Sequence, residues 1–310
     1  MESQKPKIAM YVKRPFGEKL NASFDFLKEN WKLLLKFTTY LLLPLCLIQA
    51  LSLNGLMSGA LSISAIASST AMAASSSSLI AFGSYYGLYM FLYLIGIILL
   101  TSLVYGLIRT YNEREERLQG VTLGMLKPRL FRNIKRLLLM TGACMLLVLF
   151  VGIFVGLLVA LTPFTLFLTI PFIIAFSVPL ALLAPIYLFE DITLMEAFKK
   201  TFRLGFATWG GVFLILIVMG IIASVLQGIV SIPWYVIYIV KMIFTMSDGG
   251  ATSSSVGLNF AQYLFSILML YGSYLSAIFG IVGLVYQYGH ASEVVDSITV
   301  ESDIDNFDKL

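Results

Sequence analysis

Apolar residues in this chain gather in six long runs, separated by shorter polar segments. The runs cover about residues 33–53, 79–108, 137–161, 164–189, 211–240 and 258–288. Each run has the roughly 20 residues that a helix needs to cross a hydrocarbon core about 30 Å thick. A transmembrane barrel would show alternating segments of about 10 residues instead. We therefore predict an all-α, polytopic membrane domain over residues 1–290 with six transmembrane helices, followed by an acidic, flexible tail over residues 291–310.

Amphipathic segments precede the first, third and fifth runs. Their apolar positions recur at helical spacing: Leu20, Phe24, Leu27 and Trp31; Leu123, Leu126, Leu130 and Ile134; Leu194, Phe198, Phe202 and Phe206. This pattern predicts three cytoplasmic amphipathic helices and a threefold repeat of one such helix plus one transmembrane hairpin. Two placements stay open, since the helices can lie in the headgroup layer or pack beneath the bundle.

The third amphipathic helix is expected over about Thr193–Thr208, because Thr193 and Glu196 have the spacing of a capping box. A straight continuation into the fifth run would carry basic groups into hydrocarbon, at about 2.5–3.5 kcal/mol each near the centre. We therefore expect this helix to lie nearly parallel to the membrane and to be followed by a bend. Gly205, Gly210 and Gly211 are the residues expected to supply that bend.

Composition supports the membrane assignment and excludes other classes. Of the 310 residues, 59% are hydrophobic and only 12% are charged, about half the charged share of a soluble domain. A soluble globular enzyme would need more polar surface than this chain can supply. A disordered chain would leave too much apolar surface in contact with water. The single histidine, His290, and the two cysteines, Cys46 and Cys144, cannot assemble a metal centre. We therefore expect no metal, no cofactor and two free cysteines.

Basic residues are distributed unequally between the loops. Lys and Arg gather before the first run, after the second and after the fourth, whereas the loop Asn54–Ser78 has no charge. This asymmetry predicts a multi-pass protein of the cell (inner) membrane with both termini in the cytoplasm. The loop Asn54–Ser78 itself is either a flexible loop or a short re-entrant or surface helix.

Polar residues inside the runs form stripes in the fifth and sixth runs. The members that we select as a candidate site are Gln227, Ser231, Gln262, Ser266 and Ser273. Small and polar residues on one face permit close helix contact and hydrogen bonds across it. The stripe is therefore either a packed contact or the lining of a polar cavity. Both glutamine amides are expected to face the bundle, because an amide in hydrocarbon costs several kcal/mol.

Ionisable residues are missing from the middle of every run, which argues against ion-coupled transport. No phosphate-binding glycine loop is present, so we expect a protein that is not an enzyme. The acid pair Glu190-Asp191 has the composition for binding a cation or for acid and base chemistry, but charges at a helix start are the favoured interpretation. Basic residues near the amphipathic helices are candidate contacts for anionic lipid headgroups, namely Lys199, Lys200, Arg203, Arg129 and Arg132.

The segment Glu190-Asp191-Ile192-Thr193-Leu194-Met195-Glu196-Ala197-Phe198, continuing to Trp209, resembles a known bacterial pattern. It is similar to the six-span membrane domain fused to some glycerophosphodiester phosphodiesterases, which also occurs in standalone membrane proteins. Residues 16–31 are similar to the opening segment of that family, and the resemblance covers residues 16–292. It implies a fold and a membrane location, but no catalytic residues, because nothing in this chain matches the phosphodiesterase barrel.

The expected function is that of a non-enzymatic scaffolding or lipid-associated accessory protein. Its expected partners are membrane lipids, anionic on the cytoplasmic side, and a membrane protein or a second copy of the chain; no nucleic acid is expected. The alternative is a permease or exporter for a small or lipidic molecule, which would use the polar stripe of the fifth and sixth runs.

The predicted topology can be tested with single cysteines at Ser75, Ser253 and Ser302 in a chain that lacks Cys46 and Cys144. An impermeant thiol reagent applied to intact cells should label the first two positions and spare Ser302, because only the first two lie outside. Ser302 should react once the cells are permeabilised. Labelling of Ser302 in intact cells, or protection of both other positions, would contradict the topology.

Overall fold

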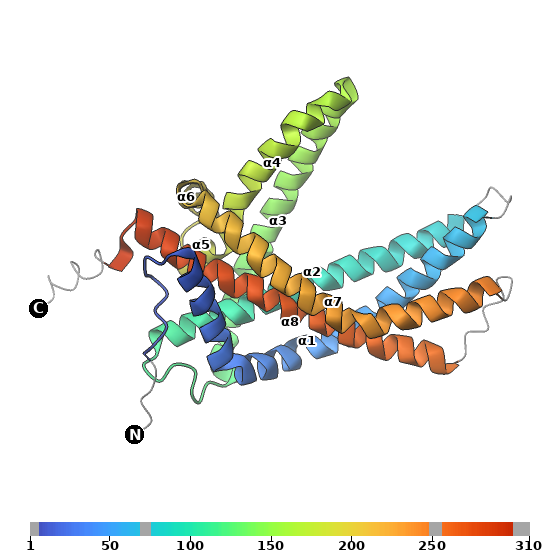
Figure 1. Cartoon of the computed structure of the whole chain (residues 1–310), viewed down its shortest axis with the longest axis horizontal. Coiled ribbons are helices and arrows are strands. Elements are labelled where there is room, and N and C mark those ends of the chain that lie inside the picture. Colours follow the sequence, from blue (N-terminus) through green and yellow to red (C-terminus); the bar gives the residue numbers. More distant parts are fainter. Residues whose placement is uncertain (1–5, 69–75, 248–255, 300–310) are drawn as a thin grey trace, which may run out of the picture. The chain divides into compact units, whose positions relative to one another are not determined.

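The structure is a computed structural model that describes residues 6–68, 76–247 and 256–299 (Figure 1). In these residues it is helical and contains no strand. The helices are α1 (Phe16–Ser68), α2 (Ser76–Glu113), α3 (Leu123–Leu161), α4 (Leu166–Leu180), α5 (Leu183–Phe189), α6 (Leu194–Ala207), α7 (Trp209–Ser247) and α8 (Val256–Val295), with a short 3-10 turn, η1 (Pro163–Thr165). Six segments of the described chain are long and apolar enough to cross a membrane. The all-α, polytopic class is therefore confirmed.

The chain divides into two compact units, and most of the long helices contribute to both. Unit 1 comprises Met1–Leu34, Thr101–Ile221 and Phe279–Leu310. Unit 2 comprises Leu35–Leu100 and Ile222–Ile278. Unit 1 therefore holds α3 to α6 with the adjoining ends of four other helices, whereas unit 2 holds only parts of α1, α2, α7 and α8.

Aromatic side chains form the core of unit 1. Phe26 of α1 is fully buried and meets Tyr111 of α2 edge to face, with the ring centroids 5.3 Å apart. Tyr286 of α8 also packs against Phe26, with a centroid separation of 6.4 Å. Edge-to-face and offset aromatic pairs add about 0.5–1.5 kcal/mol each to the burial of their apolar area. These rings therefore join three helices that are distant in the sequence.

The core of unit 2 is built around Tyr274 of α8. Its ring is 1% exposed and stacks on Tyr93 of α2, with the centroids 6.0 Å apart. Its hydroxyl donates a 2.9 Å hydrogen bond to Oε1 of Gln49 in α1. Because the hydroxyl has an acceptor, the buried tyrosine carries no unsatisfied donor.

The third amphipathic helix forms as the sequence predicts. α6 starts after Thr193, whose side chain accepts from the backbone N–H of Glu196, while Glu196 accepts from the backbone N–H of Thr193. The helix ends before Thr208, whose backbone leaves the helical region at φ −122° and ψ 28°. α7 begins directly afterwards, at Trp209. In Figure 1 α6 is seen end-on, whereas α7 crosses the view. The expected break is therefore present, but it falls at Thr208 and not at a glycine.

The first two amphipathic segments differ from the prediction. Residues 20–31 are the beginning of α1, and residues 123–134 are the beginning of α3, and each helix continues unbroken into its apolar run. The buried face of the second segment is the expected one, since Leu126 and Leu130 are buried. Only the third segment is a separate helix, so the predicted unit of one separate amphipathic helix plus one hairpin is not repeated three times.

The run at 164–189 keeps its bounds, since a candidate span covers Pro163–Phe189, but the helix is interrupted at Ala181 and Leu182, between two prolines of that run. Two other boundaries need correction. α1 extends to Ser68, through most of the segment 54–78; residues 69–75 lie outside the described part. The predicted flexible tail begins too early, because α8 continues to Val295 and buries Ala291 and Ser292 completely. Residues 300–310 lie outside the described part.

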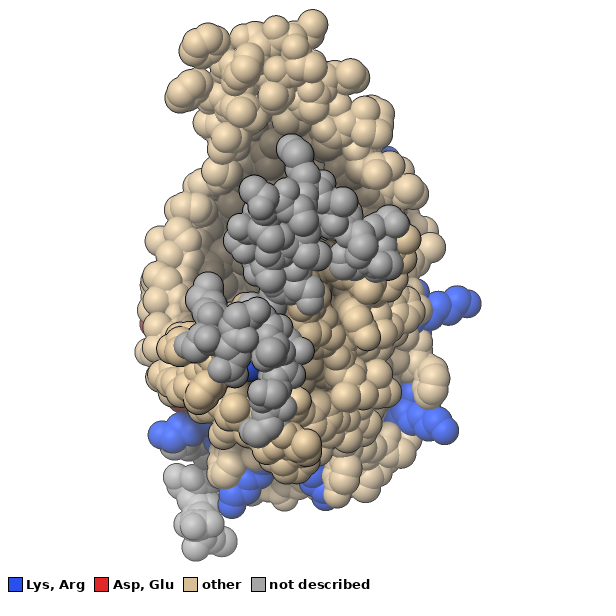
Figure 2. Space-filling view, turned by 90° about the vertical axis from the view of Figure 1, so that its right-hand side faces the viewer, with Lys and Arg blue, Asp and Glu red and all other residues tan. Residues whose placement is uncertain are grey.

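The helices α3 and α4 expose much of their apolar surface. The most apolar stretch of α3 has no buried residue, and in the segment Pro163–Phe189 only 22% of the corresponding stretch is buried. A side chain added at Gly152 or Gly156 of α3 would meet nothing within 4 Å. The exposed apolar surface of these two helices fits a hydrocarbon environment. On the face shown in Figure 2 the described residues are almost entirely uncharged, with Lys and Arg at the margins.

The contact of α6 with the end of α4 predicts a sensitive position at Gly205. A Cβ atom there would lie 2.6 Å from Cβ and 2.7 Å from Cα of Pro179, so Gly205→Ala should force the two helices apart. We expect a loss of about 2 kcal/mol in the free energy of unfolding, typical of overpacking. Gly210→Ala is the control, because its new methyl group meets nothing within 4 Å. Equal unfolding curves for the two variants in detergent would contradict this packing.

Candidate functional site

The acid pair Glu190-Asp191 lies in the connection between α5 and α6. Glu190 follows α5 with φ −92° and ψ −7°, and Asp191 has a positive φ of 55°. Aspartate tolerates this left-handed conformation better than most residues with a side chain. The two carboxylates bind different groups, so each can be described separately.

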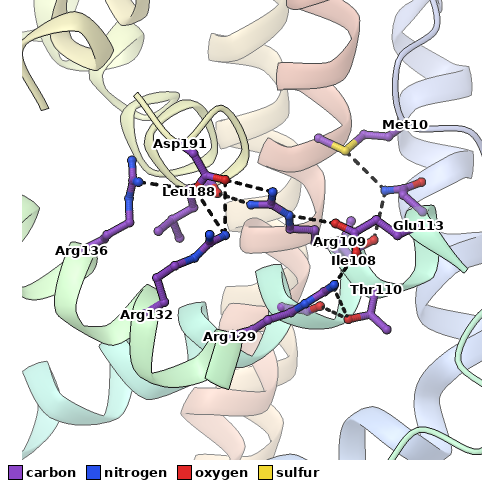
Figure 3. Close-up of polar contacts among 12 residues, drawn as sticks. Met10, Ile108, Arg109, Thr110, Glu113, Arg129, Arg132, Arg136, Leu188 and Asp191 are labelled. Carbon is purple, nitrogen blue, oxygen red and sulfur yellow. Dashed lines mark hydrogen bonds and ion pairs between the residues drawn. The ribbon is translucent and has the colours of Figure 1, made fainter. Parts of the chain in front are cut away.

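Three arginines surround the carboxylate of Asp191 (Figure 3). The ion pairs join Asp191 to Arg109 of α2 at 2.9 Å, and to Arg132 and Arg136 of α3 at 3.2 and 3.4 Å. Arg129, Arg132 and Arg136 follow at steps of three and four, so they share one face of α3. A single carboxylate thereby joins α2 and α3 to the α5–α6 connection.

Arg136 makes further contacts with the same connection. Its Nη2 donates to the backbone carbonyl oxygens of Tyr187 and Ile192 at 2.6 and 2.7 Å. Its guanidinium carbon lies 4.1 Å from the centroid of the Tyr187 ring, a cation–π contact. Only 19% of the Arg136 side chain is exposed, so Arg136 serves mainly to hold the α5–α6 connection against α3.

The second acid of the cluster is Glu113, at the end of α2. It accepts from Nε of Arg109 at 3.0 Å and forms an ion pair with Arg129 of α3. We define the arginine cluster as Arg109, Arg129, Arg132 and Arg136 with Asp191 and Glu113. Four positive charges against two negative charges leave a formal surplus of +2. Arg129 and Arg132 are 36% and 49% exposed, so the surplus faces the surface on α3.

Glu190 belongs to a second ion-pair group. It forms a 2.8 Å ion pair with Lys200 of α6 and accepts a 2.7 Å hydrogen bond from the hydroxyl of Tyr288 in α8. Lys200 also pairs with Asp296 at 2.8 Å, and Asp296 pairs with Arg203 at 2.7 Å. Burial opposes the charge of Lys200, but its hydrogen bonds to Asp296 and Glu190 outweigh this and raise the pKa of the ammonium. α6 is thereby bonded to both α5 and α8.

These contacts change the picture of the proposed headgroup residues. Lys200 is 20% exposed and lies between two carboxylates, and Arg203, although 59% exposed, pairs with Asp296. Arg129 and Arg132 combine ion pairs with substantial exposure, and Lys199 is exposed on α6. The structure therefore brings two of the five candidates, Arg129 and Arg132, into one cluster and places the other three on α6.

The polar stripe of α7 and α8 lies in unit 2 and consists mainly of packed contacts. The amide nitrogen of Gln227 donates to Oγ of Ser231 at 3.0 Å and to the carbonyl of Met269 in α8 at 3.4 Å. Nε1 of Trp234 donates to Oγ of Ser266 at 2.9 Å. Ser231 and Ser266 are buried and Ser273 is half-buried. Gln227 is therefore turned toward α8, as predicted.

Gln262 lies at one end of the stripe and lines a cavity of about 570 Å³. The residue is 3% exposed, and its Oε1 accepts a 2.8 Å hydrogen bond from Nζ of Lys241, which also donates to Oδ1 of Asn259. Asn54 and the apolar Leu51 belong to the same lining. This end of unit 2 therefore has a polar pocket, whereas Gln227 and Ser231 bond within the helix pair.

Sequence reasoning missed Glu113, Tyr288 and Asp296 as members of the polar groups. One available signal was the spacing of Arg129, Arg132 and Arg136, which predicts a basic face that needs carboxylates. Within the described residues, no group of three or more His, Cys, Asp or Glu is arranged to hold a metal ion. Both cysteines are free.

Comparisons with models of known protein families, with curated proteins and with solved structures find no match. The fold and the clusters thus define a class, an all-α polytopic membrane protein with ion-paired helix ends. The resemblance of residues 16–292 to the phosphodiesterase-associated membrane domain stays a prediction.

The arginine cluster predicts that Asp191 contributes strongly to stability. Asp191→Asn should leave three guanidinium groups close together without their carboxylate, and we expect a loss of about 2 kcal/mol in the free energy of unfolding. This is less than the 3–5 kcal/mol typical of fully buried pairs, because Asp191 is 35% exposed. Glu116→Gln is the control: Glu116 is 74% exposed and pairs only at the surface with Arg114, a contact worth about 0–1 kcal/mol. Chemical denaturation in detergent measures both, and similar losses would contradict a central role for Asp191.

Proposed function

We propose that this chain is a non-enzymatic, lipid-associated accessory protein of the cell membrane, with both termini in the cytoplasm, and that its arginine cluster binds anionic lipid headgroups. The observation that carries the proposal is the surplus of two positive charges in the cluster, displayed by Arg129 and Arg132 at the surface of α3. The distribution of Lys and Arg among the loops supports a cytoplasmic position for this cluster.

The surroundings of the two arginines support lipid as the ligand. Met125 and Phe131, in the same part of α3, are 59% and 63% exposed. Large exposed apolar side chains beside basic ones are typical of segments that lie in the interface between headgroups and acyl chains. Guanidinium groups bind phosphate oxygens through two parallel hydrogen bonds, which suits them to phospholipid headgroups.

The alternative function, a permease or exporter, depends on the cavity beside Lys241. A transport path would have to continue from Gln262 along the stripe. Ser266 is instead bonded to Trp234 and to Asn54, and Gln227 is bonded to Ser231 and Met269. These packed contacts favour a binding protein over a conducting one.

The proposal predicts that Arg129→Gln/Arg132→Gln weakens binding of phosphatidylglycerol. At about 1 kcal/mol for each basic residue near an anionic surface, the loss of affinity should be about 25-fold. The measurement is native mass spectrometry of the full chain titrated with phosphatidylglycerol or phosphatidylcholine.

Lys127→Gln/Lys135→Gln is the matched control, because it removes the same charge from exposed positions of the same helix. A loss specific to the arginine variant supports the cluster as the binding site. Equal losses in both variants would reduce the effect to general attraction and overturn the proposal. Arg129→Lys/Arg132→Lys retains the ion pairs and so separates lost binding from lost folding.

A further inference from the structure

The cavity beside Gln262 in unit 2 has an apolar part and a polar part. Its volume is about 570 Å³, within the range of about 300–1,000 Å³ that is usual for small-ligand sites. Its lining comes from α1, α2, α7 and α8, and every lining residue belongs to unit 2. The large apolar members all have exposed surface, namely Ile48, Leu51, Tyr85 and Leu88. The polar members include Ser52, Lys241, Asn259 and Gln262. Such a lining suits a ligand with a polar head and an apolar tail.

The two parts of the lining lie at different depths along their helices. Lys241 and Asn259 each lie three residues inside the end of a candidate membrane span, whereas Leu51 and Leu88 each lie nine residues inside. At a rise of about 1.5 Å per residue, this difference corresponds to about 9 Å along the helix axis. A membrane lipid has the same order, with its headgroup at the surface of the bilayer and its acyl chains deeper.

Lys241 fixes the orientation of two side-chain amides of the lining. An ammonium group can only donate, and this one donates to Oδ1 of Asn259 and to Oε1 of Gln262, both at 2.8 Å. The nitrogen of each amide is therefore the group left to donate elsewhere. Neither nitrogen forms a hydrogen bond with the part of the chain that the structure describes. Asn259 and Gln262 are three residues apart, so both donors lie on one face of α8.

Ser52 of α1 adds a third polar group to the same cavity. The residue is only 2% exposed, yet it belongs to the lining. Among the residues that the structure describes, its hydroxyl has no hydrogen-bond partner. Buried polar groups in native proteins normally have a partner. Oxygen atoms of a ligand would satisfy this hydroxyl together with the two amide nitrogens of α8.

The charge of the lining favours an anionic headgroup. Lys241 is its charged member, and no Asp or Glu is among the described residues that line the cavity. α8 begins at Val256, so Asn259 lies in its first turn, where the helix dipole favours negative charge. A zwitterionic headgroup would also bring a cationic nitrogen, for which this lining offers no carboxylate. An anionic phosphate with acyl chains therefore fits the cavity better than a zwitterionic lipid.

We propose that this cavity binds one anionic phospholipid. Its phosphate would lie beside Lys241 and accept from the amide nitrogens of Asn259 and Gln262, and an acyl chain would lie along Leu51 and Leu88. The site shares no residue with the arginine cluster, which belongs to unit 1, so it does not depend on the function proposed for that cluster.

The test is native mass spectrometry of the full chain titrated with phosphatidylglycerol, phosphatidylcholine or glycerol 3-phosphate. Gln262→Glu keeps the shape of the side chain but places a carboxylate beside Lys241, which repels an anionic headgroup. Lys241→Met removes the cation itself. Lys36→Met is the matched control, because it lowers the net charge by the same single unit at an exposed position of unit 2 outside the cavity.

We expect the wild-type chain and Lys36→Met to bind phosphatidylglycerol equally well and to prefer it to phosphatidylcholine. Gln262→Glu and Lys241→Met should each bind the lipid of the cavity at least about tenfold more weakly, as the loss of one hydrogen bond to a charged group implies. Equal affinities in all four proteins, or phosphatidylcholine bound as tightly as phosphatidylglycerol, would overturn the site. Glycerol 3-phosphate lacks acyl chains and should bind more weakly than the lipid; equal binding of the two would overturn the assignment to a lipid.

Gln262→Glu decides the matter if Lys241→Met does not fold. Its new carboxylate can pair with Lys241, so without lipid this variant should unfold at a temperature no lower than that of the wild type. A folded Gln262→Glu chain with wild-type affinity would by itself overturn the site. Arg129→Gln/Arg132→Gln leaves the cavity unchanged and should keep its lipid. The failure of this site and the failure of the arginine cluster to bind lipid can therefore be told apart.

Discussion

Unit 1 depends on the carboxylate of Asp191. Arg109 and Arg136 would otherwise bring two largely buried positive charges from different helices against each other, and Arg132 would add a third. Asp191 reaches them because its backbone turns through the left-handed region directly after α5. The adjacent Glu190 binds Lys200 and Tyr288, so a two-residue segment connects α2, α3, α6 and α8. The helix ends in unit 1 are thus positioned by charge, whereas its interior is positioned by aromatic packing.

The sequence was sufficient for the features that depend on local pattern. Apolar runs of membrane length and the capping box at Thr193 each depend on residues close together in the chain, and both are present. The prediction placed separate amphipathic helices before the first and third runs, but α1 and α3 are continuous. They are continuous because amphipathic and apolar segments both favour helix and no strong breaker separates them. The bend was expected at glycines, but Gly205 serves close contact with Pro179, and the chain turns at Thr208. Helix packing therefore decided how the glycines are used.

The candidate site was predictable only in part. Arg132 was selected for its charge, but its partner could not be identified, since Arg132 and Asp191 lie 59 positions apart. Arg129 was selected in the same way, and its partner Glu113 lies on another helix, 16 positions away. The alternatives for the polar stripe were also undecidable from spacing, because a serine or glutamine suits a cavity and a packed helix contact equally well. The structure shows both, a packed contact at Gln227 and a cavity at Gln262, because the helix ends of unit 2 leave space that its middle does not.

The unbroken course of α3 has a mechanical consequence. One end of this helix holds the arginines bound to Asp191, and the most apolar stretch toward its other end has no buried residue. A helix without an internal break transmits tilt along its length, so a bilayer that is thicker or thinner than the apolar end prefers will also rotate the arginine end. The ion pairs at 3.2 and 3.4 Å to Arg132 and Arg136 are the first contacts that such a tilt would lengthen. In a membrane, the preferred thickness of the apolar end and the charge exposed at the arginine end would thus be properties of one continuous helix.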